Sequence, residues 1–253
     1  MFSQCDITLG DRLISQSSAT HPYRAMIETL LNFTEDTLKS QFSVGAMNSF
    51  ALDGPNQGFK ARAAHSKNSR EVHLLGPLHA DILFCKRLLL NSVDLRIKLT
   101  PASDAFCLMG AADSTFRLNI LGASLFVKKT TISPVVRLGH AVALQRANAS
   151  LPPLTHVTVK TFSIPANSRI CNQDNLFLGP VPKYLVLGMV HHEAFTGKRN
   201  LSPFNFIHND VEYLALCQDG RQVPAKAFQP QFGQGISVRS ESFTTCSSPQ
   251  ADT

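Results

Sequence analysis

The sequence contains no tryptophan and only three tyrosines, and charged residues make up just 17% of its 253 residues. No charged start is followed by a long apolar run, so we predict that the protein has no signal peptide and is not secreted. The longest apolar stretches, such as residues 184–190, are far shorter than the roughly 20 residues that a membrane-spanning helix needs. We therefore expect no membrane association.

Cysteines are few and widely spaced, and no CxxC motif is present. The six cysteines are Cys5, Cys85, Cys107, Cys171, Cys217 and Cys246. This spacing argues against a zinc module and against a dense disulfide framework. It favours reduced thiols, as in the cytoplasm or nucleus.

Apolar residues, in contrast, are abundant: they make up 43% of the chain and include 17 phenylalanines. Low charge combined with high apolar content suits a protein that buries much of its surface against neighbours, although an ordinary β-rich domain would also fit. The formal net charge of +6 favours polyanionic partners. The richest basic run is predicted to be either a solvated loop or a DNA-facing loop, and it comprises Lys60, Arg62, His65, Lys67 and Arg70.

Strand patterns dominate the hydrophobic periodicity. Residues 5–14 alternate as a half-buried strand, and further strands are predicted at 71–75, 78–84, 93–99, 106–109, 155–164, 185–190, 211–217 and 222–225. Residues 116–131 are predicted to form one long strand or a pair of strands. Two helices are predicted to start at Pro22 and at Ser133–Pro134, where serine suits the N-cap and proline suits the first turn. Residues 43–69 are predicted to be a long surface loop, and Asp219–Gly220 a hairpin turn. These patterns predict an all-β protein with inserted helices.

A weak internal repeat suggests two units. Leu75-Gly76-Pro77 recurs as Leu178-Gly179-Pro180, and both halves contain a strand that leads into a proline-started helix. Pro, Ser, Asp and Gly cluster between residues 100 and 115, where we place the boundary. The predicted organisation is a first unit over 1–104, a second over 105–232 and a disordered tail over 233–253.

One short motif suggests an enzyme. His79-Ala80-Asp81 matches the HxD pattern of non-haem iron oxygenases, which also use a jelly-roll barrel, and residues i and i+2 of a strand share one face. His191 could supply a third ligand, and Arg199 could bind an acidic co-substrate. This oxygenase is kept as an alternative. The sequence shows no nucleophile with a nearby base and no phosphate-binding loop, so our main expectation is no enzyme, no metal and no cofactor.

Phe204 and Phe206 alternate after Pro203. They are predicted either to pack in the core or to form a subunit contact, because aromatic residues are enriched at interface centres.

Several blocks of this chain, in order, resemble the major capsid proteins of Maverick/Polinton elements and adintoviruses. They cover most of residues 2–232 and read FSQCDITLGDRLIS, HPYRAMIETLLNF, LLGPLHADILFCKRLLLNSVDLRIKL, AFCLM, LFVKKTTISP, DNLFLGPVPKYLVLGMV and AFTGKRNLSPFNFIHNDVEYLALCQDGRQVPAKAFQPQF.

The resemblance implies a tandem, hexon-like double jelly-roll that is incomplete at both ends, since family members extend further. It implies a structural subunit of a virus-like transposable element that self-associates into a trimeric capsomer and surrounds packaged DNA. Its location would be the virion, or the nucleus or cytoplasm of the host. A host-retained fragment that no longer assembles is a further alternative, because a truncated jelly roll leaves unpaired strand edges.

Overall fold

The computed structural model describes residues 1–15, 18–34, 37, 57–85, 88–89, 93–111, 113–146, 156–177, 182–218, 220–223, 225–230 and 232. The predicted tail at 233–253 lies outside these residues.

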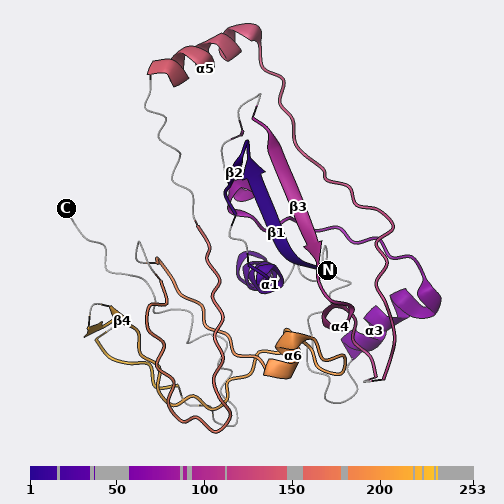
Figure 1. Ribbon diagram of the computed structural model, residues 1–253, viewed down its shortest axis with the longest axis vertical. Helices are drawn as coiled ribbons and strands as arrows, with labels where there is room; N and C mark the ends of the chain where they lie inside the picture. The colour runs from indigo at the N-terminus through magenta and orange to yellow at the C-terminus, as the bar shows by residue number, and fades with distance from the viewer. Residues whose placement is uncertain are drawn as a thin grey trace.

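The central element is a three-stranded antiparallel sheet in the order β2-β1-β3 (Figure 1). Strand β1 spans Phe2–Leu9, β2 spans Arg12–Leu13 and β3 spans Leu95–Pro101. The strand predicted over residues 5–14 is therefore two strands, separated by a turn in which Gly10 has a φ of 57°. The strand predicted at 93–99 is confirmed as β3, which pairs with β1 along almost its whole length.

The core lies on one face of this sheet. Strand alternation places Cys5 and Ile7 on that face together with residues of β3 and the segment before it. Ile7 is 1% exposed, Ala80 is 4% exposed, and the partly buried residues around them are Leu78, Ile82, Leu95, Ile97 and Leu99. A small group of side chains thus holds together segments about 90 positions apart in the sequence.

Helix α1 spans His21–Asn32 and packs against β1. Pro22 occupies its first turn, as predicted, because a proline there loses no intrahelical hydrogen bond. The helix ends at Asn32, with Phe33 in an extended conformation. Leu38 and Phe42, whose spacing in the sequence also fits the apolar side of this helix, lie outside the described residues.

Several predictions for local structure were wrong. The strand predicted at 71–75 is absent. Residues 78–84 do not form a strand; Asp81–Phe84 form a short 3-10 helix, η3, that begins when Leu83 N–H bonds to Ala80 O. Residues 106–109 were predicted as a strand, but Asp104–Cys107 form the short helix α4, because the Ser103 hydroxyl caps the N–H of Phe106. Part of the predicted loop at 43–69 is helical, with α3 over Gln57–Ser66 and η2 over Lys67–Ser69. Alanine, lysine and arginine in α3 are strong helix formers.

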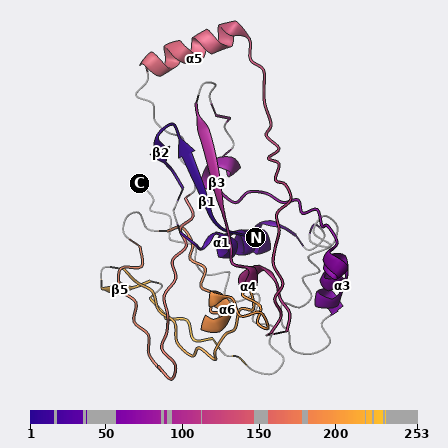
Figure 2. The same cartoon turned by 45° about the vertical axis from the view of Figure 1, so that its right-hand side comes forward.

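Residues 116–131 are extended but form no strand pairing with any described residue. They lead into helix α5, Pro134–Arg146, whose predicted start is confirmed by a 3.4 Å bond from Val136 N–H to the Ser133 hydroxyl. Helix α5 contacts none of the other helices and strands that the structure describes, and two views show it projecting beyond the sheet (Figures 1 and 2).

The C-terminal third contains helix α6, His192–Thr196, and a hairpin of β4, Cys217–Gln218, with β5, Arg221–Gln222. The hairpin predicted at Asp219–Gly220 is confirmed, since Gln218 pairs with Arg221 and Gly220 has a positive φ. An isolated antiparallel bridge joins Leu214 to Phe228 outside this hairpin. The strands predicted at 155–164 and 185–190 are absent from the described parts of those ranges.

Among the residues described, the fold consists of small antiparallel sheets together with several helices. The antiparallel strands and inserted helices follow the prediction, but the helices and unpaired segments make the fold mixed rather than all-β. None of the described helices is long and apolar enough to span a membrane.

We predict that Ile7→Ala lowers the free energy of unfolding by about 2–5 kcal/mol, because it opens a cavity at the most buried position. Urea titration followed by circular dichroism measures this loss. Ile14→Ala is the matched control: Ile14 is 37% exposed, and its loss should cost below about 1 kcal/mol. Equal losses in the two variants would contradict this location of the core.

Candidate functional site

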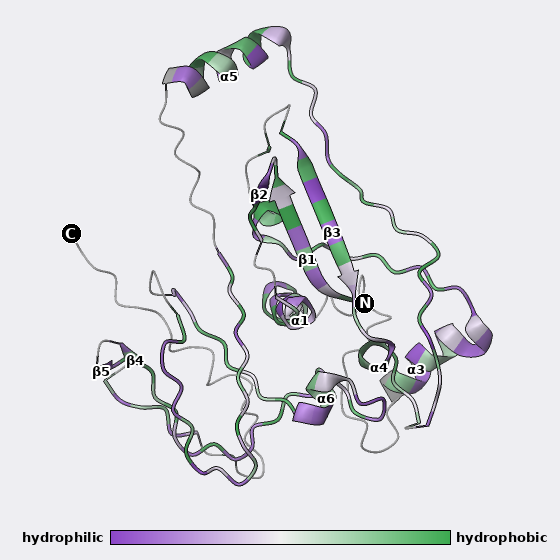
Figure 3. Ribbon diagram, viewed as in Figure 1, coloured by the Kyte–Doolittle hydropathy of each residue, from purple (hydrophilic) through white to green (hydrophobic). Residues whose placement is uncertain are grey.

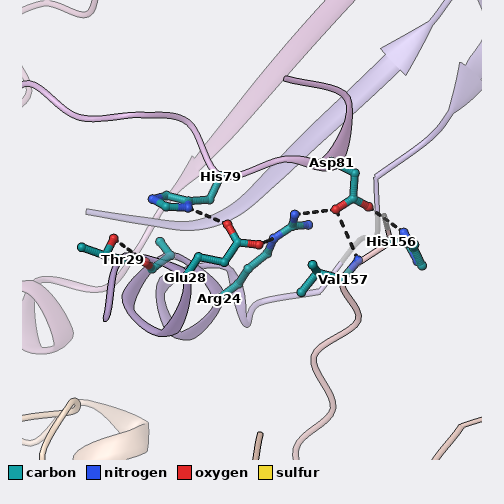
Figure 4. A network of polar contacts seen from close by, with 8 residues as sticks. Arg24, Glu28, Thr29, His79, Asp81, His156 and Val157 are labelled. Atoms are coloured by element: carbon teal, nitrogen blue, oxygen red, sulfur yellow. Dashed lines mark hydrogen bonds and ion pairs between the residues drawn. The ribbon is translucent and has the colours of Figure 1, made fainter. Parts of the chain in front are cut away.

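A chain of ion pairs and hydrogen bonds connects α1 to two distant segments (Figure 4). At one end, His79 Nδ1 lies 2.6 Å from Glu28 Oε2, and the His79 side chain is only 6% exposed. Glu28 Oε1 accepts a 2.9 Å bond from Arg24 Nε, one helical turn earlier on α1. This half of the network joins His79, at the start of the 79–81 segment, to the side of α1.

The other half starts from the same arginine. The second guanidinium nitrogen of Arg24 bonds to Asp81 Oδ1, and Asp81 Oδ2 lies 2.6 Å from His156 Nδ1. The backbone N–H of Val157 also donates to Asp81, at 3.3 Å. Arg24 therefore bridges two carboxylates, and each carboxylate in turn holds a histidine.

Burial makes these contacts strong. The side chains of Arg24, Glu28 and Asp81 are 13–15% exposed, so water screens their charges only weakly. Burial alone would raise the pKa of Glu28, but the hydrogen bond from His79 and the charge of Arg24 outweigh it and lower that pKa below its usual value. Glu28 is thus held as a carboxylate.

His21, in the first turn of α1, lies in a buried environment that disfavours its positively charged form. Burial, followed by the nearby His79 and Arg24, lowers the pKa of His21 to about 4. The folded protein therefore holds His21 neutral at physiological pH, one helical turn from the positively charged Arg24.

Chemically, this network is an ionic cross-link between three segments that are far apart in the sequence. Two of the predicted iron ligands belong to this network, since His79 is bonded to Glu28 and Asp81 to Arg24 and His156. His191 instead occupies the N-cap position of α6, without a side-chain cap hydrogen bond. The three do not come together, and no group of three His, Cys, Asp or Glu side chains in the described part of the chain could hold a metal ion. Arg199, the proposed co-substrate contact, instead donates a 2.9 Å bond to Phe116 O.

A second cluster is aromatic and surrounds Tyr23 of α1. The Tyr23 ring stacks on Phe195 at 5.5 Å between centroids and meets Phe204 and Phe106 edge-on at 5.6 Å and 6.1 Å. Burial raises the pKa of Tyr23 to about 12, and its hydroxyl finds no hydrogen-bond partner among the described residues. Gly197, with a φ of 97°, lets α4 and α6 approach here, since a Cβ would lie 3.1 Å from Phe106 N.

The two predicted interface phenylalanines thus have partners within the chain. Phe204 is partly buried in the aromatic cluster, and it also lines an open apolar pocket with Met1, Phe2, Pro22 and Met26. The Phe206 ring lies directly over Gly188, where a Cβ would be 2.9 Å away. Both rings thus pack within the chain, in line with the prediction of core packing. A subunit contact made by Phe204 and Phe206 stays a prediction.

The predicted basic loop is a helix and a turn. Lys60 lies on α3, Lys67 on η2 and Arg70 just after it, and all three are exposed. Arg62, also on α3, is partly buried. Contact with DNA stays a prediction for these residues.

Sequence reasoning missed Arg24 and Glu28, the centre of the polar network. Their spacing of four on one helix was a usable signal, since such pairs lie on the same face. Their distant partners Asp81 and His156 carried no local signal.

Comparison with known proteins gives little further guidance. No protein-family model matches the chain, and no solved structure matches it. The chain is 20% identical over 228 residues to an uncharacterized protein of Caenorhabditis elegans. That alignment covers 88% of this chain and 54% of the relative, so the chain spans about half the length of the relative.

We predict that Arg24→Met lowers the free energy of unfolding by about 2–4 kcal/mol, because it leaves two partly buried carboxylates without their shared partner. The control is Arg96→Met. Arg96 is 67% exposed and paired with Asp94, and its loss should cost at most about 0.5 kcal/mol. Urea unfolding at pH 7 compares the two, and similar midpoints would show that the network does not stabilise the fold.

We predict that His21 makes the fold sensitive to mild acid. The unfolded chain binds a proton at His21 below about pH 6.5, whereas the folded chain binds it only near pH 4, so stability is lost as the pH falls through this window. Urea midpoints measured from pH 7 to pH 5 should fall less steeply in His21→Gln. His73→Gln, at a side chain that is 93% exposed, should keep the wild-type slope. An unchanged slope in His21→Gln would contradict the prediction.

Proposed function

We propose that this chain is a structural capsid subunit, or a segment of one, that acts by self-association. The observation that carries the proposal is the large amount of exposed apolar surface beside a small core. Ile7 is the only large side chain below 2% exposure in the described part, whereas many leucines, valines and phenylalanines are more than half exposed, among them Leu75, Phe84, Phe116, Leu121, Phe126, Val135 and Leu138.

Apolar surface of this extent favours association. Isolated soluble proteins rarely expose large contiguous apolar patches, and subunit interfaces are where such surface is normally covered. The low charge fraction of the chain is consistent with the same role. The resemblance of its ordered sequence blocks to Maverick/Polinton and adintovirus capsid proteins supplies the specific identity proposed.

The proposed parent architecture is the double jelly-roll. Antiparallel sheets with open edges support it, since further strands could extend them. Within this proposal the capsomer is a trimer, the basic residues of α3 and η2 face packaged DNA, and the protein acts in the virion or in the host nucleus or cytoplasm.

Sedimentation velocity of the full 253-residue chain over a hundredfold range of concentration tests the proposal. We expect concentration-dependent association that includes a trimer, with larger assemblies visible by negative-stain electron microscopy. A single monomeric species at every concentration, with cooperative unfolding, would contradict it and would favour the host-retained fragment that does not assemble.

A further inference from the structure

The segment from Asn119 through α5 is an arm without a partner among the described helices and strands, and we refer to residues 119–146 as the arm. Its base is fixed: Phe116 O accepts a bond from Arg199, and Leu118 N–H donates to Asp104 at 2.9 Å. Beyond this point no hydrogen bond or ion pair joins residues 119–132 to any described residue. Both ribbon views show the arm leaving the body (Figures 1 and 2).

The arm carries many apolar residues, both in its extended part and in α5 (Figure 3). In the extended part, Leu121 is 70% exposed, Phe126 is 83% exposed and Leu125 is 57% exposed. Further exposed apolar side chains lie along the same arm, at Ile120, Val127, Val135, Val136, Leu138 and Val142. A segment of this length falls in the range of about 20–30 residues that each partner contributes to a stable interface of standard size.

Strand β3 offers the complementary feature, an open edge. Gly10 N–H donates to Asp94 O, so Gly10 and Asp94 form a hydrogen-bonded pair. Hydrogen-bonded pairs alternate along an antiparallel ladder. The next such pairs between β1 and β3 therefore involve Arg96 and Lys98. The backbone groups of Leu95, Ile97 and Leu99 consequently point away from β1. No described strand lies on that side of β3, because the sheet order is β2-β1-β3.

The arm has the sequence pattern of a strand that would fit this edge. Leu121, Ala123, Leu125 and Val127 recur at a period of two, which places them on one face of an extended chain. The β3 residues on the core side of the sheet follow the same period. A strand formed by residues 121–127 would therefore continue the apolar face of the sheet while pairing its free backbone groups.

We infer that residues 121–127 of the arm add as a strand to the outer edge of β3 in a second copy of this chain. The inference rests on the proposed self-association and names the surfaces that carry it. A second copy is the occupant because one chain supplies both halves, the extended donor and the open acceptor edge. The arm pairs with no described strand of its own sheet, and α5 contacts no other described helix or strand of its own chain. Exchange of such an element between identical protomers is a common route to oligomers.

Sedimentation velocity and hydrogen exchange on the full chain test this inference with Leu125→Asp. The aspartate places a charge in the apolar row, and we expect the apparent dissociation constant for self-association to rise by about tenfold or more. The matched control is Ile170→Asp, at a position that is 76% exposed and outside the arm, and it should associate like the wild type. Circular dichroism and the urea midpoint verify that both variants fold.

Hydrogen exchange resolved by residue reads the acceptor edge directly. The amides of Leu95, Ile97 and Leu99 should become protected as the wild-type concentration rises and should stay exposed in Leu125→Asp. Protection that is already complete in the monomer would mean that the arm binds its own β3, and it would overturn the inference. Association that Leu125→Asp leaves unchanged would overturn the arm contact while the proposed function stands. A wild-type chain that never associates would remove both.

Discussion

The constraint on which the rest of this structure depends is the small size of its core. In the described part, few residues are buried: Cys5, Ile7 and Ala80 lie between β1, β3 and the 78–82 segment, and Tyr23 and Ala194 are the other buried apolar residues of this part. Apolar burial contributes about 25 cal/mol per Å² of surface, so a core this small contributes little against the entropy of ordering the chain. Other interactions must therefore hold the distant segments, and much apolar surface is left over.

The polar network around Arg24 is the first consequence of this constraint. It fixes α1 to the 79–81 segment and to His156 through directional contacts. A partly buried arginine between two carboxylates is favourable when all three charges are present and costly when one is missing. The network consequently specifies one arrangement of these segments, which a small apolar group alone would leave loosely defined.

The features that sequence could predict are those with a local cause. Pro22 and the Ser133–Pro134 pair located the starts of α1 and α5, and the turn before Gly220 located the β4–β5 hairpin. Long-range partners left no such signal. The His79-Ala80-Asp81 motif suggested a metal site because imidazoles and carboxylates bind metals and form ion pairs equally well. The ion pair with Arg24, which is 57 residues from Asp81 in the sequence, distinguishes an ion-pair network from a metal site.

The remaining mismatch concerns residues 116–131, which have a strand-like sequence and an extended backbone but no pairing strand among the described residues. Alternation of apolar residues indicates a chain suited to a half-buried sheet, and a sheet requires a partner for its backbone groups. Strand β3 has an apolar face and an outer edge that pairs with no described strand. Backbone pairing with another strand would satisfy both the 116–131 segment and the edge of β3, and it would cover their apolar side chains. In a chain whose core is small, an interface that completes its sheet would supply the burial that the single chain lacks.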